Sequence, residues 1–125
     1  MNFVPAPFAL RVFRQPHQGP NAARNRGIRA ARGRIVLITG DDMIPEPGFL
    51  AAHLKFHEQH PGELDAMLGF IDWSPEITVT PFMRSLVSPE GGFQFAFHEV
   101  RDGMADFRLF YTSNVSLKAS LLARQ

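Results

Sequence analysis

Two adjacent carboxylates, Asp41 and Asp42, are the residues of this 125-residue chain best suited to chemistry. They follow an uninterrupted apolar run at residues 35–38, which predicts a strand buried on both faces, as in a parallel sheet. Ligands of open α/β sheets bind beyond the carboxyl ends of strands, and paired carboxylates suit a hard divalent cation that carries an anionic ligand. From these residues alone an acidic turn is an equal alternative, because Gly-Asp pairs commonly form turns.

Three histidines could bind a metal ion by their spacing. His53 and His57 are four residues apart and His57 and His60 three apart, but no HExxH glutamate and no third ligand accompany them. We therefore predict that they lie on a partly exposed helix face. Trp73 could stack on a sugar ring or pack in the interior, and the sequence leaves both open.

The net charge of +1 conceals an asymmetry. Residues 1–40 contain seven arginines and no acid, whereas residues 41–125 contain all twelve acids and six bases. A basic segment of this kind can bind nucleic acid or the phosphate groups of a ligand, or can be a solvated helix face. A polyanion- or nucleic-acid-binding module formed by residues 11–34 is therefore an alternative function.

The remaining composition narrows the setting. The absence of cysteine excludes disulfides and thiolate metal sites and favours a cytoplasmic protein. No apolar run approaches the ~20 residues that span a bilayer, so we expect no transmembrane segment, while peripheral attachment to a membrane stays open.

Alternating elements must position these residues. Breakers and periodicity predict a helix at residues 21–32, capped by Asn21 and ended by Gly33. Phe93, Phe95 and Phe97 alternate as in a half-buried strand or packed loop. The other expected elements are strands at 8–13, 34–39, 64–71 and 107–112, and helices at 47–60, at 81–87 and from Ser116. This order predicts right-handed crossovers and a parallel α/β sheet.

Several of these segments resemble one family. Residues 19–28 (GPNAARNRGI), residues 31–33 and the strand that ends in Gly40-Asp41-Asp42 resemble the family 2 glycosyltransferases of the GT-A fold. In that family an A-R-N-x-G helix precedes a strand ending in a DxD-type motif. Pro45 and Phe49-Leu50 fit its continuation, and residues 110–117 resemble its asparagine-serine segment. The resemblance covers residues 8–60 and 107–122 and implies an incomplete GT-A-like, mostly parallel sheet flanked by helices.

The resemblance also implies an activity. It is the inverting, metal-assisted transfer of a sugar, of the hexosyltransferase type, from a nucleotide-diphosphate sugar to a hydroxyl of a carbohydrate, lipid or protein. Mg²⁺ or Mn²⁺ would be held by Asp42 and Asp41, with Arg24, Asn25 and Asp41 on the donor side and Asn114 on the acceptor side. Thr39 and Gly40 stand where many relatives carry another acid, so which aspartate binds the metal stays open.

Two family features are not recognisable in the chain: the strand and helix that hold the base, and an E-D type motif carrying the general base. We therefore expect residues 1–125 to be a single partial glycosyltransferase domain that is inactive by itself, with no nucleic-acid partner. A nucleotide hydrolase with a Walker B-like strand is a weaker alternative, because no G-x-x-x-x-G-K-[ST] loop is present.

Overall fold

The computed structural model describes residues 8–88, 97, 100 and 103–124. The chain divides into two compact units, Met1–Arg32 and Gly33–Gln125, and each is described by itself. The expectation of one partial domain over residues 1–125 is not decided by this division and stays a prediction. Most of the Phe93 to Phe97 alternation lies outside the described residues.

The first unit contains helix α1, Gly19–Ala30. It begins two residues before the predicted start because Pro20, whose fixed φ suits a first helical turn, is already helical. Asn21 is therefore inside the first turn, and Gln18 is the N-cap. The helix ends at Ala30 because Ala31 is extended, with ψ 145°.

The segment before α1 is not a strand, so the prediction for residues 8–13 was wrong. Side-chain bonds hold it to the helix instead of a strand ladder. Arg11 donates to the Ala30 carbonyl at 2.6 Å, and Arg26 donates to the Arg14 carbonyl at 2.6 Å. The guanidinium of Arg26 also lies 5.2 Å from the centre of the Phe13 ring, a cation–π distance.

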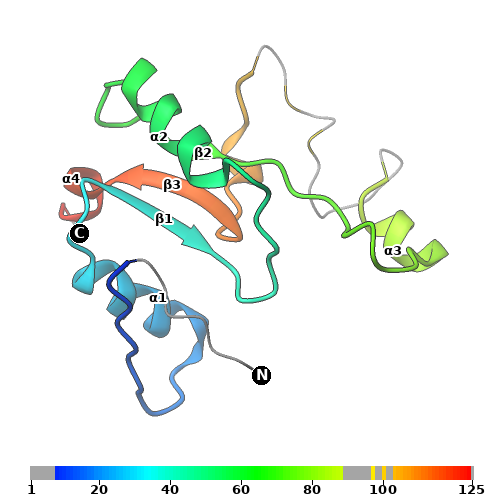
Figure 1. Ribbon diagram of the computed structural model, residues 1–125, viewed down its shortest axis with the longest axis horizontal. Coiled ribbons are helices and arrows are strands. Elements are labelled where there is room, and N and C mark those ends of the chain that lie inside the picture. The colour runs from blue at the N-terminus through cyan, green and yellow to red at the C-terminus, as the bar shows by residue number, and fades with distance from the viewer. Residues whose placement is uncertain (1–7, 89–96, 98–99, 101–102, 125) are drawn as a thin grey trace. The chain divides into compact units, whose positions relative to one another are not determined.

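The second unit is built on a three-stranded sheet of order β1-β3-β2 (Figure 1). Its strands are β1 Ile35–Thr39, β2 Met67–Leu68 and β3 Asn114–Lys118, and β3 is antiparallel to both neighbours. The prediction of mostly parallel pairing was therefore wrong for the described strands. After β2 the chain returns to the sheet where β1 and β2 end. Strand β3 therefore begins there and runs between β1 and β2 in the opposite direction.

The end of the chain also departs from prediction. Residues 107–112 are not a strand. Phe107–Leu109 form a 3₁₀ turn, η2, which Asp106 caps by accepting from the Arg108 amide at 2.9 Å. The strand follows as β3, so helix α4, Ala119–Leu122, begins three residues after the expected Ser116. The polar–apolar alternation of β3 is a strand signal that the sequence analysis missed.

The helices predicted at residues 47–60 and 81–87 are confirmed. Helix α2 spans Phe49–Gln59 and helix α3 spans Pro81–Leu86. Gly48 precedes α2 with φ 86°, a left-handed conformation that glycine adopts without steric cost. Thr80 caps α3 by accepting from the Met83 amide at 3.2 Å.

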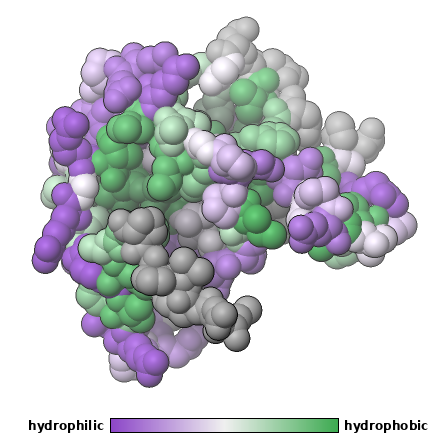
Figure 2. Space-filling view, in the orientation of Figure 1, coloured by the Kyte–Doolittle hydropathy of each residue, from purple (hydrophilic) through white to green (hydrophobic). Residues whose placement is uncertain are grey.

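The apolar interior of the described residues is small. It consists of Val36, Ile71, Leu109, Val115 and Leu117. Many large apolar side chains are exposed instead, and green patches mark apolar residues on the surface in Figure 2. Two of them, Leu50 and Leu54, are 66% and 52% exposed on α2. These two leucines therefore do not hold α2 to the sheet.

Candidate functional site

One edge of the sheet collects the ends of all three strands. Because β1 and β2 are each antiparallel to β3, they run in the same direction, and their carboxyl ends lie where β3 begins. Residues 40–42 leave β1 there, residues 69–73 leave β2 there, and Ser113 and Asn114 open β3. The expected location of a ligand site beyond strand ends therefore has a structural counterpart, although β3, which lies between β1 and β2, is antiparallel to both.

We call Gly40, Asp41 and Asp42 the acidic loop. Its first residue is held by β3, because the Gly40 amide donates to the Ser113 carbonyl at 3.3 Å. Asp41 and Asp42 are both exposed and lie on a turn. A Cβ added at Gly40 would meet the Oδ1 of Asp42, so this carboxylate folds back over the end of β1. Glycine leaves the room for it.

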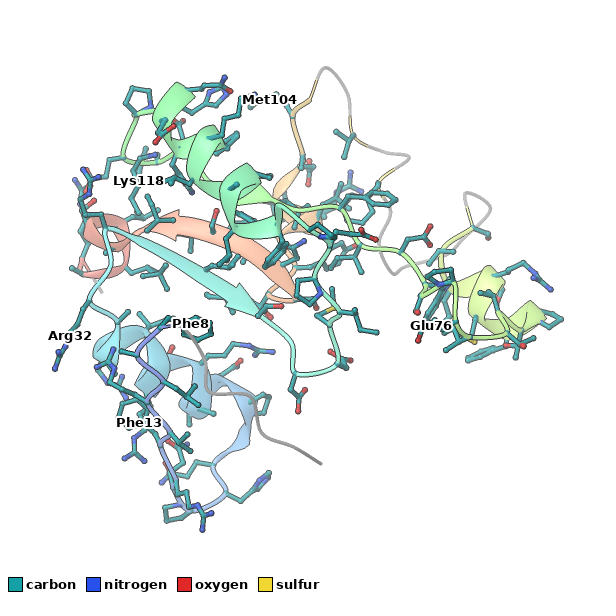
Figure 3. The ribbon with its side chains drawn as sticks, in the orientation of Figure 1. Phe8, Phe13, Arg32, Glu76, Met104 and Lys118 are labelled. Atoms are coloured by element: carbon teal, nitrogen blue, oxygen red, sulfur yellow. The ribbon has the colours of Figure 1, made fainter. Side chains whose placement is uncertain are left out.

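A second cluster joins α2 to β3 beside this edge, and we call it the polar centre. Its members are two histidines of α2 and three alternate residues of β3, namely His53, His57, Asn114, Ser116 and Lys118. Lys118 lies between β3 and α2 in Figure 3. His53 and His57 are only 4% and 6% exposed, so the prediction of a partly exposed face was wrong. The helix turns its histidines inward because β3 offers hydrogen-bond partners there.

The polar centre is a continuous chain of hydrogen bonds. Lys118 Nζ lies 3.2 Å from His57 Nδ1, and His57 Nε2 lies 2.9 Å from Ser116 Oγ. Ser116 Oγ lies 2.8 Å from His53 Nδ1, and His53 Nε2 lies 2.9 Å from Asn114 Oδ1. Every imidazole nitrogen therefore has a partner, as buried polar atoms require.

The chain continues at both ends into backbone carbonyls. Asn114 Nδ2 donates to the Phe70 carbonyl at 3.2 Å, and Lys118 Nζ donates to the His60 carbonyl at 2.8 Å. The backbone of Asn114 also accepts from the Gly69 amide at 2.9 Å. Asn114 thus ties the segment after β2 to α2.

These end groups fix the position of every proton. A lysine ammonium only donates, so His57 Nδ1 accepts, and the neutral ring carries its proton on Nε2 and donates to Ser116. A carbonyl only accepts, so Asn114 presents Oδ1 to His53, whose Nε2 must donate. The Ser116 hydroxyl then donates to His53 Nδ1. The hydrogen bonds therefore all donate in the same direction, from Lys118 towards the Phe70 carbonyl.

The surroundings of both imidazoles favour their neutral form. Burial lowers the pKa of His53, and its hydrogen bond with Asn114 only partly opposes this. Burial also lowers the pKa of His57, and the Lys118 ammonium lowers it further, while the Ser116 contact and the Asp65 carboxylate act in the opposite direction. A proton on His57 Nδ1 would face the ammonium directly.

Apolar strands enclose the centre. Leu37 on β1 and Met67 on β2 stand opposite Ser116, so they share its face of the sheet. Phe49 packs edge-on against His53, with ring centres 5.0 Å apart. The hydrogen bonds of the centre are therefore formed in a poorly solvated environment, which strengthens them and makes an unpaired group costly.

The residues expected on the donor side belong to the other unit. Arg24 and Asn25 lie on α1, where Arg24 Nη1 donates to Asn21 Oδ1 at 3.0 Å and Asn25 is exposed. Asn114, expected on the acceptor side, is 4% exposed, and its amide is bonded in both directions. Trp73 is half-buried at the edge where β2 ends.

The donor set for a cation is limited. Among the described residues no group of three or more His, Cys, Asp or Glu side chains is arranged to hold a metal ion. The acidic loop contributes two hard oxygen donors, which fits a cation whose remaining ligands come from phosphate and water. The ring nitrogens of His53 and His57 are already hydrogen-bonded within the polar centre.

The sequence contained a signal for the polar centre that our reading passed over. His53 and His57 have the spacing of one helix face, and Asn114, Ser116 and Lys118 have the spacing of one strand face. Two polar stripes of matching donors and acceptors can satisfy each other when buried. The sequence analysis instead placed Asn114 on the acceptor side and the histidines on a partly exposed helix face.

A mixed α/β unit with carboxylates beyond a strand end is typical of proteins that bind ligands at this edge. The chain matches the glycosyl transferase family 2 over residues 2–114, and it therefore belongs to this family. The resemblance seen in the sequence is confirmed, and the membership implies the GT-A fold. Searches of curated proteins and of solved structures gave no significant match.

Within the part of the chain that the structure describes, none of the helices has the length and apolar character needed to cross a bilayer.

Proposed function

We propose that this glycosyltransferase transfers a sugar, of the hexosyl type, from a nucleotide-diphosphate donor to an acceptor hydroxyl with inversion and with the help of Mg²⁺ or Mn²⁺. Family membership supports the reaction class. The observation that carries the site is the acidic loop, which places two exposed carboxylates where β1 and β2 end and β3 begins. The acceptor would be a carbohydrate, a lipid or a protein.

Asp42 and Asp41 would hold the cation. When bound, it would neutralise the charge that develops on the leaving diphosphate. Asp42 is folded back over Gly40, so its carboxylate lies near the end of β1, and Asp41 would serve as a second ligand or as a contact to the donor. Arg24 and Asn25 are proposed on the donor side and Asn114 on the acceptor side, where its bonded amide would act by fixing Phe70.

Donor binding is the measurement that tests this proposal, since it reports on the acidic loop separately from the transfer step. We would titrate the chain with UDP, GDP, ADP, CDP and dTDP by calorimetry, with and without Mn²⁺. We expect one of them to bind only with Mn²⁺, and Asp42→Ala to abolish that binding. Asp41→Ala is the matched control. The variant that loses more diphosphate affinity identifies the carboxylate that binds the metal ion directly.

The outcomes separate this function from its alternative. Binding that needs no metal ion, or that Asp42→Ala leaves unchanged, would contradict the proposed site. The polyanion-binding alternative at residues 11–34 predicts salt-dependent binding to any DNA duplex, which Asp42→Ala does not affect.

A further inference from the structure

The acidic loop depends on β3 for its attachment. Thr39, the residue before the loop, stands opposite Asn114 in the ladder, and the Gly40 amide donates to the carbonyl of Ser113. The aspartates themselves are exposed, so the loop backbone decides where their carboxylates lie. Any shift of the first residues of β3 is therefore passed to the loop.

Those first residues are in turn held from α2. The side-chain oxygen of Asn114 accepts from His53, and its amide nitrogen reaches the Phe70 carbonyl. The hydrogen-bond chain that begins at Lys118 gives His53 one tautomer and one ring orientation, and the edge of Phe49 supports the ring from the side. His53 has no rotational freedom that keeps both of its bonds.

We propose that His53 is a positioning residue for the acidic loop. It holds Asn114, Asn114 fixes the start of β3, and the Ser113 carbonyl carries that placement to Gly40. Its importance for catalysis rests on the proposed function, whereas its effect on the loop does not. The functional part is the bond from Nε2 to Asn114, and the bond from Nδ1 to Ser116 keeps the ring oriented.

Two substitutions separate the bond of His53 to Asn114 from its bond to Ser116. In His53→Gln the side-chain amide nitrogen replaces Nε2 and can still donate to Asn114, while the acceptor for Ser116 is lost. In His53→Asn the side-chain oxygen replaces Nδ1 and can still accept from Ser116, while the donor to Asn114 is lost. Each variant loses one buried hydrogen bond, so the two form a matched pair for stability. The exposed His17 supplies a control, His17→Gln.

The first measurement is the backbone amide resonances of the acidic loop by ¹H–¹⁵N NMR. We expect His53→Asn to shift the resonances of Gly40, Asp41 and Asp42, and His53→Gln and His17→Gln to leave them near those of the unmodified chain. Unchanged resonances in His53→Asn, or equal shifts in both His53 variants, would overturn the positioning role.

The second measurement is binding of UDP, or of whichever diphosphate the panel identifies, in the presence of Mn²⁺. Loss of an outer hydrogen bond to a metal site lowers affinity about 10–100-fold, so we expect a loss of about tenfold in His53→Asn and less than about threefold in His53→Gln. Equal affinity in both variants would overturn the role in binding. No metal-dependent binding by the unmodified chain would refute the proposed function, and the NMR result would still decide the role in the loop.

A third variant covers the case in which His53→Asn does not fold. Phe49→Leu removes the ring that supports His53 but leaves every hydrogen-bonding group in place. We expect it to shift the Gly40 resonance in the same direction as His53→Asn, by a smaller amount. An unchanged resonance in a folded Phe49→Leu chain would count against the proposal.

Discussion

The polar centre and the acidic loop meet at the same end of β3, and different forces hold them. The histidines of the polar centre are buried, and every ring nitrogen of His53 and His57 has a hydrogen-bond partner within the protein. The acidic loop is exposed, and one backbone bond from Gly40 ties it to Ser113. The region proposed to bind the ligand is thus held to the sheet by fewer bonds, and the region beside it holds the strand to which it is attached.

This difference assigns opposite consequences to substitutions. Disturbing the polar centre should lower stability and alter the loop, because the loop is attached through Asn114 and Ser113. Disturbing the loop should alter ligand binding and leave stability almost unchanged, because nothing buried depends on it.

The largest effect is expected for Gly69→Ala, which strikes the point where the two regions join. A methyl group at Gly69 would lie 2.5 Å from Oδ1 of Asn114 and closer still to Nδ2. Asn114 is bonded at both ends and cannot move aside without losing these bonds. We expect the free energy of unfolding to fall by about 3 kcal/mol, measured by urea denaturation with circular dichroism.

A glycine elsewhere provides the control for this substitution. Gly27 lies within α1, and an added Cβ would meet nothing within 4 Å. Gly27→Ala should therefore be neutral or stabilise the chain by about 0.5–1 kcal/mol, as alanine does inside helices. Equal stability of Gly69→Ala and the unmodified chain would show that Asn114 is not fixed as described.

A smaller effect, spread over a range of pH, should distinguish the two regions by titration. The pKa values of His53 and His57 are lowered by burial from the ordinary value of 6.5, so the unfolded chain binds more protons than the folded one below that pH. Their contribution to stability should be complete above about pH 6.5 and should be lost as pH falls toward the lowered values. Thermal unfolding between about pH 7.5 and 5 measures this loss.

The double variant His53→Gln/His57→Gln tests whether the histidines cause this dependence. It should be less stable at neutral pH, and its stability should change less between about pH 6.5 and 5. Parallel profiles for the variant and the unmodified chain would assign the dependence to other groups and would weaken the description of the centre.

The sequence predicted the position of the acidic loop directly after β1 because its signals are local. The apolar run of β1, Gly40 and the aspartates are contiguous. Pro47 and Gly48 precede helix α2, and helix α3 begins with Pro81. The family also follows from contiguous motifs, and the match over residues 2–114 confirms it.

The polar centre and the pairing of the sheet could not be found in the same way. His53 and Ser116 are 63 residues apart, and only the folded chain shows that each satisfies the other. Local hydrophobicity places Leu54 inside and His57 outside, whereas the structure has the reverse. The direction of β3 depends on a return of the chain after β2 that no local periodicity records.

The smallest change in stability is expected for Gly40→Ala, which affects the loop alone. Gly40 does not have a positive φ, so alanine can adopt its backbone, but the new methyl group would take the place of the Asp42 carboxylate. That carboxylate is the end of an exposed, flexible side chain and can swing away, so the free energy of unfolding should change by less than about 0.5 kcal/mol. Mn²⁺-dependent diphosphate binding should nevertheless weaken by about threefold to tenfold, since the carboxylate proposed to bind the metal ion has lost its orientation. Calorimetry and urea denaturation of the same preparation decide it, and a loss of stability as large as that of Gly69→Ala would mean that the loop, too, is part of the buried framework.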